Sequence, residues 1–165
     1  RGPMASRALT QIVTETNWPE LDILLIDMPP GTGDIQLTLS ENIKCDGAII
    51  VTTPQNIALA DAQKGIQMFQ KVNTPILGLV ENMSQFVCSQ CGTAHELFGS
   101  GGGQRCASQH NVPLLAQLTL NPSVRDQGDQ GRPYSLIDTN LEYQKLALSL
   151  MMQLSKKTQQ TIAIS

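Results

Sequence analysis

Residues 21–34 read LDILLIDMPPGTGD, an apolar run that ends at Asp27 and is followed by a Pro-Pro-Gly-Thr-Gly loop. A continuous apolar run of this length predicts a strand that is buried on both faces, as in a parallel sheet. Nucleotide-dependent α/β enzymes often end a strand in this way, with an acid that governs magnesium near a γ-phosphate. Such a site also needs a G-x-x-x-x-G-K-[ST] loop, and the sequence contains none. The stretch therefore predicts a nucleotide-switch segment without its phosphate loop.

Strand-like and helix-like stretches alternate along the rest of the chain. Besides 22–28, apolar runs bounded by turn residues predict buried strands at 47–53, 76–80 and 113–118. The spacing of apolar residues predicts helices at 5–16, 35–41, 58–72, 104–110 and 139–156. Polar, turn-rich composition predicts loops at 85–103 and 121–134. This alternation is typical of right-handed βαβ units around a parallel sheet, so we predict an α/β fold.

Composition limits the kind of protein that this chain can be. Its 165 residues suffice for one domain, and with only 4% aromatic residues the core must rest on Leu, Ile, Val, Ala and Met. A net charge of −3 argues against a broad nucleic-acid surface, which needs clustered Lys and Arg. No apolar run approaches the ~20 residues that span a membrane, and residues 1–20 lack the pattern of a signal peptide. We therefore expect a cytoplasmic protein with neither nucleic-acid nor membrane partners.

The first predicted strand and its loop carry several residues of chemical interest. Burying Asp27 would be costly without a cation or hydrogen-bond donors, so we interpret it as an acid that orients a magnesium-bound water. The alternative is an Asp that caps a turn. Gly31 and Gly33 would let backbone N–H groups approach phosphate oxygens. Asp34 is predicted to cap the helix that follows.

Two further polar segments, Thr53–Gln55 and Asn82, follow the predicted strands 47–53 and 76–80. Ligands of parallel sheets bind beyond the carboxyl ends of the strands, so these segments are expected to share one edge with Asp27. The amide of Asn82 could read the edge of a nucleobase, because it donates and accepts hydrogen bonds at once. Judged from the residues alone, a turn-forming Asn is the favoured interpretation.

Two of the four cysteines form the motif Cys88-Ser-Gln-Cys91, followed by a glycine. The spacing can place two sulfurs on one metal, and we favour metal or cluster binding over inert thiols and over a disulfide. Zinc and cubane iron–sulfur clusters both need four ligands. His95 and Cys106 could supply the others, or the same pair could come from a second subunit across a twofold axis. The glycine run at 99–103 has no lysine at the phosphate-loop position and is interpreted as a hinge and helix entry.

These stretches together resemble the Mrp/ApbC family of P-loop ATPases, which is related to MinD, to nitrogenase iron protein and to mitochondrial NUBPL. The resemblance lies in LDILLIDMPPGTGD, GAIIVTTPQNIALADAQKG, PILGLVENMS, the C-x-x-C pair and FGSGGG, and it runs from Arg1 to about Leu150. Its most specific parts are Asp27–Thr38, Thr52–Gly65 and Asn82–Cys91. It implies a three-layer α/β/α P-loop NTPase fold of the MinD/ParA type.

The resemblance also implies a function. Members of the family bind and hydrolyse ATP with Mg²⁺, form homodimers, hold a [4Fe–4S] cluster between the paired cysteines of two subunits, and pass it to apo iron–sulfur proteins. Carried over by position, Cys88 and Cys91 would be the cluster ligands. Asp27 would be the switch acid near magnesium. Asn82 would contact adenine, which reverses the preference for a turn. Thiolates also accept Zn²⁺, which could occupy the same site.

In the family, the phosphate loop and its strand lie upstream of the resembling stretch, and that strand sits between those predicted at 22–28 and 47–53. We therefore expect residues 1–157 to be the C-terminal part of one nucleotide-binding domain with a partial sheet and a metal loop at 85–103. Residues 158–165 are predicted to be a flexible tail. We expect no ATP turnover by this chain alone. Thr119 stands where family members often carry proline.

Two other functions stay open. The first is a zinc-stapled, non-catalytic dimerisation module, which the same cysteines would serve. The second is a MinD/ParA-like partition ATPase. It is disfavoured because residues 156–165 lack the basic, amphipathic pattern of a helix that binds a membrane surface.

Overall fold

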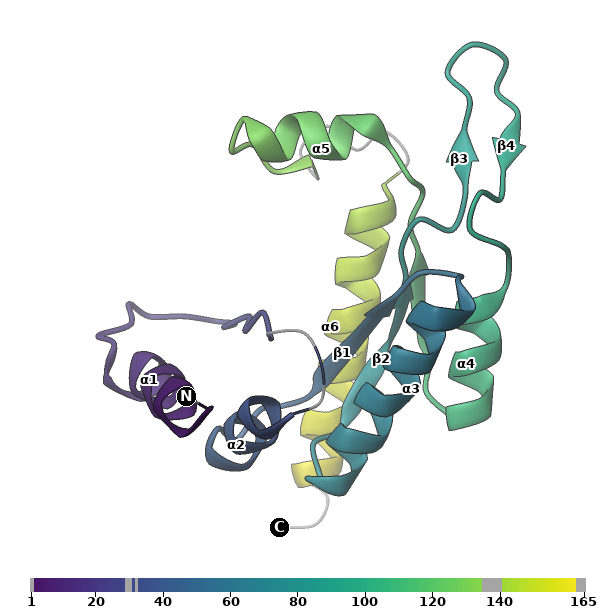
Figure 1. The fold of residues 1–165 in the computed structure, drawn as a ribbon. Coiled ribbons are helices and arrows are strands. Elements are labelled where there is room, and N and C mark those ends of the chain that lie inside the picture. Colours follow the sequence, from purple (N-terminus) through teal and green to yellow (C-terminus); the bar gives the residue numbers. More distant parts are fainter. Residues whose placement is uncertain (1, 29–30, 32, 135–140, 163–165) are drawn as a thin grey trace.

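A three-stranded parallel sheet forms the centre of the computed structural model, which describes residues 2–28, 31, 33–134 and 141–162. Its strands are β1 (Ala48–Thr52), β2 (Ile76–Glu81) and β5 (Leu114–Gln117), in the order β1-β2-β5 (Figure 1). The register pairs Val51 with Val80 and Glu81 with Gln117. Helices α3 (Asn56–Lys71) and α4 (Gly102–His110) connect the strands as βαβ units. The predicted strands at 47–53, 76–80 and 113–118 and the α/β class are confirmed.

Helices cover both faces of the sheet. Helices α3 and α4 pack on one face, and α6 (Glu142–Ile162) packs on the other. Successive residues of a strand point to opposite faces. In β2, Leu79 therefore joins the core under α3 and α4, whereas Val80 packs with Tyr143 and Leu146 of α6. This is the predicted three-layer arrangement.

Two more helices lie to one side of the sheet. α1 (Gly2–Glu15) and α2 (Asp34–Asn42) contact each other and confirm the helices predicted at 5–16 and 35–41 (Figure 1). The N-cap of α2 is Gly33, because Asp34 already belongs to the helix. The prediction that Asp34 caps this helix is therefore wrong.

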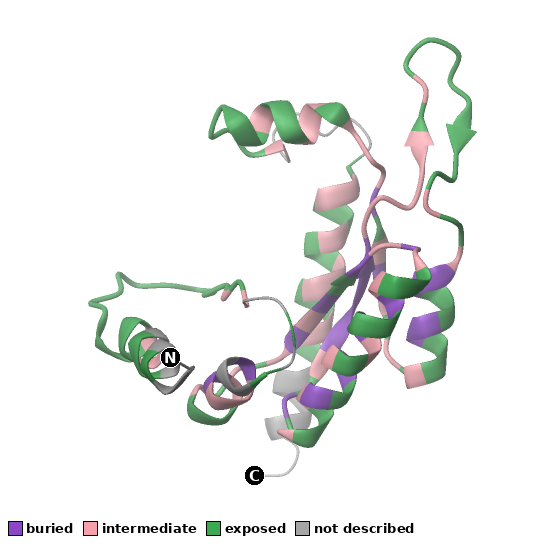
Figure 2. Ribbon diagram, in the orientation of Figure 1, coloured by how far each residue is buried: buried purple, intermediate pink, exposed green. Residues whose placement is uncertain are grey.

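The stretch 21–28 does not form the strand predicted at 22–28. It is irregular and largely exposed, with Leu25 at 75% exposure, as Figure 2 shows for the whole segment. An apolar run becomes a buried strand only where a neighbouring strand pairs its backbone and other elements cover its faces. Within the described residues, β1 pairs with β2 alone and no strand lies beside 21–28. Pro29, Pro30 and Thr32 of the predicted loop lie outside the described residues.

Two segments predicted as loops contain regular structure. A short hairpin of β3 (Phe86–Val87) and β4 (Ala94–His95) forms within 85–103. Helix α5 (Pro122–Asp129) forms within 121–134. The Asn121 side chain accepts a hydrogen bond from the Ser123 N–H at 3.0 Å and caps α5, and Pro122 follows at its start. The Asn-Pro pair is a helix-start signal that the low apolar content of this segment obscured.

Helix α6 extends beyond its predicted end at 156. It continues to Ile162 and so occupies much of the tail predicted at 158–165. Residues 139, 140 and 163–165 lie outside the described residues. Among the helices that the structure describes, none is both long enough and apolar enough to cross a membrane.

Candidate functional site

The β3–β4 hairpin carries the two cysteines of the C-x-x-C motif at its tip. Its strands are antiparallel, with Val87 opposite Ala94. The Cys88 N–H donates to the Thr93 carbonyl at 2.9 Å, which continues the same pairing by one step. Figure 1 shows the hairpin projecting beyond the sheet and its helices. The tip is therefore open to a second molecule.

A tight turn brings the two sulfurs together. The Gly92 N–H donates to the Cys88 carbonyl at 2.9 Å, and Gly92 has a φ of +71°, a conformation that residues with side chains rarely adopt. Cys91 is exposed and Cys88 is half-buried. The Cys88 thiol is among the hydrogen-bond partners of the Cys91 sulfur. The turn thus places the Cys88 side chain near enough to the Cys91 sulfur to lower the pKa of Cys91, as the spacing of the motif predicts.

The Cys91 sulfur has a polar surrounding that favours the thiolate. Its thiol donates a hydrogen bond to the Thr93 hydroxyl oxygen at 3.2 Å. Once its proton has left, the sulfur can accept hydrogen bonds from the Thr93 hydroxyl, and then from the Thr93 backbone and the Cys88 side chain, which hold the pKa of Cys91 below the ordinary value of 9.0. The thiolate is the form that attacks electrophiles and binds metals. Cys91 is therefore the more readily ionised of the described thiols for which a shift is resolved.

The described part of the chain places two candidate metal ligands, Cys88 and Cys91, at this site. Nowhere among the described residues do three or more His, Cys, Asp or Glu side chains gather as a metal site would require. His95 is exposed on β4, and Cys106 lies on the buried face of α4 at 2% exposure, where burial raises its pKa. The possibility that His95 and Cys106 complete the site within one chain is therefore not met. The thiol pair fits half of a zinc or iron–sulfur site.

A buried carboxylate joins the two ends of the segment that carries the hairpin. Glu81 ends β2 and is 1% exposed. One of its oxygens accepts a hydrogen bond from the Gly103 N–H, and the other accepts one from Gln117 Nε2 at 2.7 Å. The chain leaves the sheet after Glu81 and returns at α4, so this contact fixes the base of the hairpin. Sequence reasoning missed Glu81; the available signal was a charged residue at the end of an apolar run.

The glycine run at 99–103 serves helix entry, as predicted. Gly101 is the N-cap of α4 with a φ of +63°. A Cβ on Gly102 would lie 2.7 Å from the Pro54 carbonyl oxygen, and one on Gly103 would lie 2.8 Å from Glu81. Small residues are required here because the first turn of α4 packs directly on the ends of the strands.

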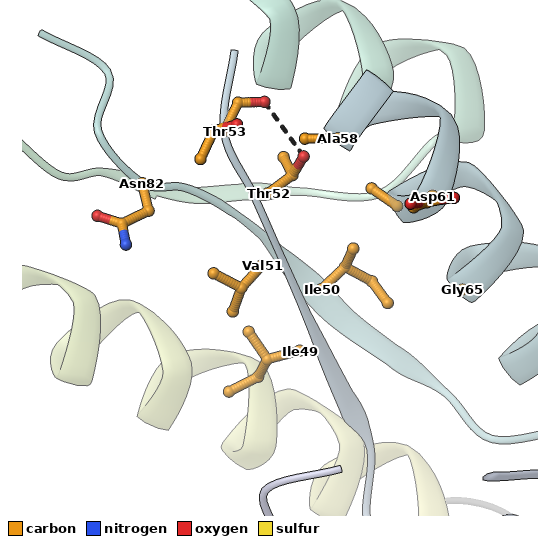
Figure 3. A pocket seen from close by; sticks show the side chains of 10 residues that line it. Ile49, Ile50, Val51, Thr52, Thr53, Ala58, Asp61, Gly65 and Asn82 are labelled. Carbon is orange, nitrogen blue, oxygen red and sulfur yellow. Dashed lines mark hydrogen bonds between the residues drawn. The ribbon is translucent and has the colours of Figure 1, made fainter. Parts of the chain in front are cut away.

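An open pocket of about 450 Å³ lies along β1 and α3 (Figure 3). Its polar lining comes from Thr52, Thr53, Asp61 and Asn82, and the rest is aliphatic side chains and backbone. Thr53 and Asn82 follow the carboxyl ends of β1 and β2, so the prediction that these two segments share one edge is confirmed. Figure 3 shows the Thr52 hydroxyl directed at the Thr53 carbonyl, to which it donates at 3.2 Å.

Asn82 forms a turn and also lines the pocket, and its contact with adenine stays a prediction. Its Oδ1 accepts a hydrogen bond from the Met83 N–H at 2.9 Å, and Met83 has a φ of +56°, so Asn82 does stabilise a turn. Its own N–H donates to the Thr52 carbonyl at 2.7 Å. This bond holds the residue at the pocket, where its side chain is half-exposed.

The remaining predicted residues lie elsewhere. Asp27 is exposed within the irregular segment, so the prediction that it ends a buried strand is wrong. Gly31 has a φ of +97°, and Gly33 precedes α2. None of these three residues lines the pocket beside Asn82. Their roles toward magnesium and phosphate stay predictions.

Known proteins match most of the chain. The family named ParA and described as NUBPL iron-transfer P-loop NTPase matches residues 1–155. An iron–sulfur cluster carrier protein from Pseudomonas fragi is 55% identical over 153 residues, which cover 90% of this chain and 53% of that protein. The chain therefore spans about half the length of this relative.

Solved structures give the same fold. A nucleotide-binding protein from Archaeoglobus fulgidus, in complex with ADP, matches with a TM-score of 0.70 at 36% identity and covers 78% of this chain and 53% of that one. The cell-division ATPase MinD from Pyrococcus furiosus matches with a TM-score of 0.58 over 98% of this chain and 59% of that one. At 19% identity, the likeness to MinD concerns the fold alone.

Proposed function

The chain belongs to the NUBPL iron-transfer P-loop NTPase family, and on that premise we propose that it carries an iron–sulfur cluster on Cys88 and Cys91 and passes it to apo iron–sulfur proteins. The observation that carries this proposal is the pair of thiols held together at the tip of a projecting hairpin. Thiolates are the usual ligands of iron–sulfur clusters. An exposed tip lets a recipient protein approach the cluster directly.

A second copy of the chain supplies the other half of the ligand set. A cubane cluster takes four thiolates, and the described residues place two beside each other. The same two cysteines from a partner related by a twofold axis would complete the set. We therefore propose a homodimer that meets at the hairpin tips and holds one [4Fe–4S] cluster between them.

We also propose that the protein binds a nucleotide, and this part of the proposal rests on its family. Asn82 would contact the adenine of ATP, while Asp27 would act toward Mg²⁺ and Gly31 and Gly33 toward phosphate. The pocket beside Asn82 supports the first role. The 165 residues contain no G-x-x-x-x-G-K-[ST] loop, so we propose that this chain by itself does not hydrolyse ATP.

The proposed cargo calls for a reducing compartment. All four cysteines are free thiols, and a disulfide between Cys88 and Cys91 would remove both ligands. Thiols stay reduced in the cytoplasm and are oxidised in secretory compartments. We therefore propose a cytoplasmic location.

Anaerobic reconstitution with ferrous iron and sulfide tests the proposal. The wild-type chain is expected to gain the broad visible absorption of a [4Fe–4S] cluster and to elute as a dimer. Cys88→Ala and Cys91→Ala are expected to lose both properties. Cys45→Ala removes a thiol far from the hairpin in sequence and is expected to behave like wild type. No cluster uptake by the wild-type chain would refute the proposal.

Zinc is the second candidate cargo. Two convergent thiols from each of two chains also make the tetrahedral site that Zn²⁺ prefers. A zinc-stapled dimer would take up one tightly held Zn²⁺ for every two chains and would reject iron and sulfide. The same reconstitution therefore separates the two candidates, because metal content and absorption differ.

A further inference from the structure

Thr93 contacts both cysteines of the hairpin tip. Its carbonyl accepts the hydrogen bond from the Cys88 N–H at 2.9 Å. Its hydroxyl oxygen lies 3.2 Å from the Cys91 sulfur, within hydrogen-bonding distance. Its backbone is a further partner of that sulfur. Thr93 follows Gly92, whose left-handed conformation lets the chain turn between Cys88 and Thr93. Thr93 is thus a hydrogen-bond partner of both Cys88 and Cys91.

We propose that Thr93 is a positioning residue for the cargo, and that its hydroxyl donates a hydrogen bond to the Cys91 sulfur whenever that sulfur ligates a metal. This inference rests on the proposed function, because it concerns how the same two sulfurs hold their cargo. It goes further by naming a residue outside the C-x-x-C motif that sets how firmly the cargo is held.

The chemistry of the two groups fixes the direction of the bond. The neutral thiol donates its proton to the Thr93 oxygen, as the structure has it. Metal binding releases that proton to solvent and leaves a sulfur that can only accept. A hydroxyl is both donor and acceptor, so a rotation about its C–O bond lets it donate to the same sulfur.

Such a hydrogen bond has two measurable consequences. It withdraws charge from the ligating sulfur, which stabilises the more negative, reduced state of a cluster and so raises its reduction potential. It also holds Cys91 in the orientation that binds the metal, which slows dissociation of the cargo. Both effects belong to the hydroxyl, because the backbone contacts of Thr93 persist whatever its side chain is.

Three variants separate the hydroxyl from the rest of the residue. Thr93→Val removes the hydroxyl and keeps the branched shape. Thr93→Ser keeps the hydroxyl and removes the methyl group. Ser89→Ala is the matched control, since it removes a hydroxyl from the same turn, at a residue with none of the described contacts to either sulfur.

The experiment loads each variant anaerobically with iron and sulfide, then measures the rate of cluster loss to a chelator and the midpoint potential. Thr93→Val is expected to lose its cluster about fivefold faster, the effect of one hydrogen bond, and to shift to a more negative potential. Thr93→Ser and Ser89→Ala are expected to match wild type. Wild-type behaviour of Thr93→Val, or equal defects in the valine and serine variants, would overturn the inference.

Failure of the proposed function is recognised separately. If the wild-type chain takes up no cluster, the carrier proposal fails, and Co²⁺ alone then tests Thr93. Thiolate ligation gives Co²⁺ an intense near-ultraviolet absorption that Cys91→Ala removes. Thr93→Val is then expected to bind Co²⁺ about fivefold more weakly than Thr93→Ser. Equal Co²⁺ affinities of these two variants would contradict the role given to the hydroxyl.

Discussion

The buried carboxylate of Glu81 accepts a hydrogen bond from the backbone N–H of Gly103, so the end of β2 is tied to the first turn of α4. The two residues enclose the entire hairpin that carries the cysteines. An N–H at the start of a helix has no partner within the helix, and a carboxylate is a favourable acceptor there. The buried side chain of Glu81 therefore helps to fix the base of the segment that carries Cys88 and Cys91.

Glu81→Ala is expected to destabilise the fold by about 1–3 kcal/mol, because it leaves the buried Gly103 N–H without its acceptor and also removes the hydrogen bond from the exposed Gln117 side chain. Chemical unfolding in urea measures this change. Glu96→Ala, at an exposed glutamate of the same segment, is the control and is expected to change stability by less than ~0.5 kcal/mol. Equal effects of the two substitutions would show that Glu81 carries no special role.

Gly103→Ala tests the same contact from the other side. A Cβ at this position would lie 2.8 Å from Glu81, so the helix must shift, at a cost of about 1–3 kcal/mol. Gly128→Ala in α5 is the matched comparison, because a Cβ there would meet nothing within 4 Å. This second substitution is expected to be neutral or to stabilise by up to ~1 kcal/mol. Thermal unfolding of both variants measures these changes. A Gly103→Ala protein as stable as wild type would contradict the close packing of Gly103 against Glu81.

Thr119 allows a test of the contact between the end of β5 and the start of α6. Its N–H and its hydroxyl both donate to one oxygen of Glu142, at 3.0 and 2.9 Å, which ties the end of β5 to the start of α6. Thr119→Pro removes both donors and is expected to cost about 1–3 kcal/mol in urea unfolding. Thr119→Ser keeps both donors and should stay within ~1 kcal/mol of wild type. A proline variant that is at least as stable as wild type would show that these bonds are dispensable.

The thiols are expected to differ sharply in reactivity. Hydrogen bonds from Thr93 lower the pKa of Cys91, whereas burial raises that of Cys106. Since the thiolate is the reactive form, alkylation of Cys91 should rise with pH and reach its half-maximum below pH 9.0. Cys106 should react only when the protein unfolds. Iodoacetamide labelling across a pH series, read by peptide mass spectrometry, measures both rates. Faster labelling of Cys106 than of Cys91 in the folded protein would contradict the structure.

Local patterns explain why much of the fold could be predicted. The runs at 47–53 and 76–80 are apolar on both faces. Helices bury both faces of β2, and in β1 they bury the face that carries Ile50 while Val51 on the other face stays exposed, so pattern and environment agree fully for β2 and partly for β1. The Cys88–Cys91 spacing likewise needs only a tight turn to bring two sulfurs together. The interactions that shape the cysteine turn lie within a few residues of one another, whereas the two strands pair with each other across the sequence and the local pattern indicates them because that pairing forms.

Distant partners explain what could not be predicted. Residues 22–28 have the same apolar pattern as β1, yet a strand needs a neighbouring strand, and the described part of the chain places none beside them. Glu81 is buried because Gly103 and Gln117 meet it from other elements, which no local pattern reveals. Helix α5 is the exception, since Asn121 and Pro122 do signal its start locally.

The most direct measurement of the central claim is the iron, sulfide and zinc content of the anaerobically reconstituted chain, together with its mass in solution. The proposal predicts a dimer with one [4Fe–4S] cluster for every two chains, and loss of cluster and dimer together in Cys88→Ala. The proposal would be contradicted if the reconstituted wild-type chain stayed monomeric and contained no iron. It would also be contradicted if the chain bound zinc but no cluster.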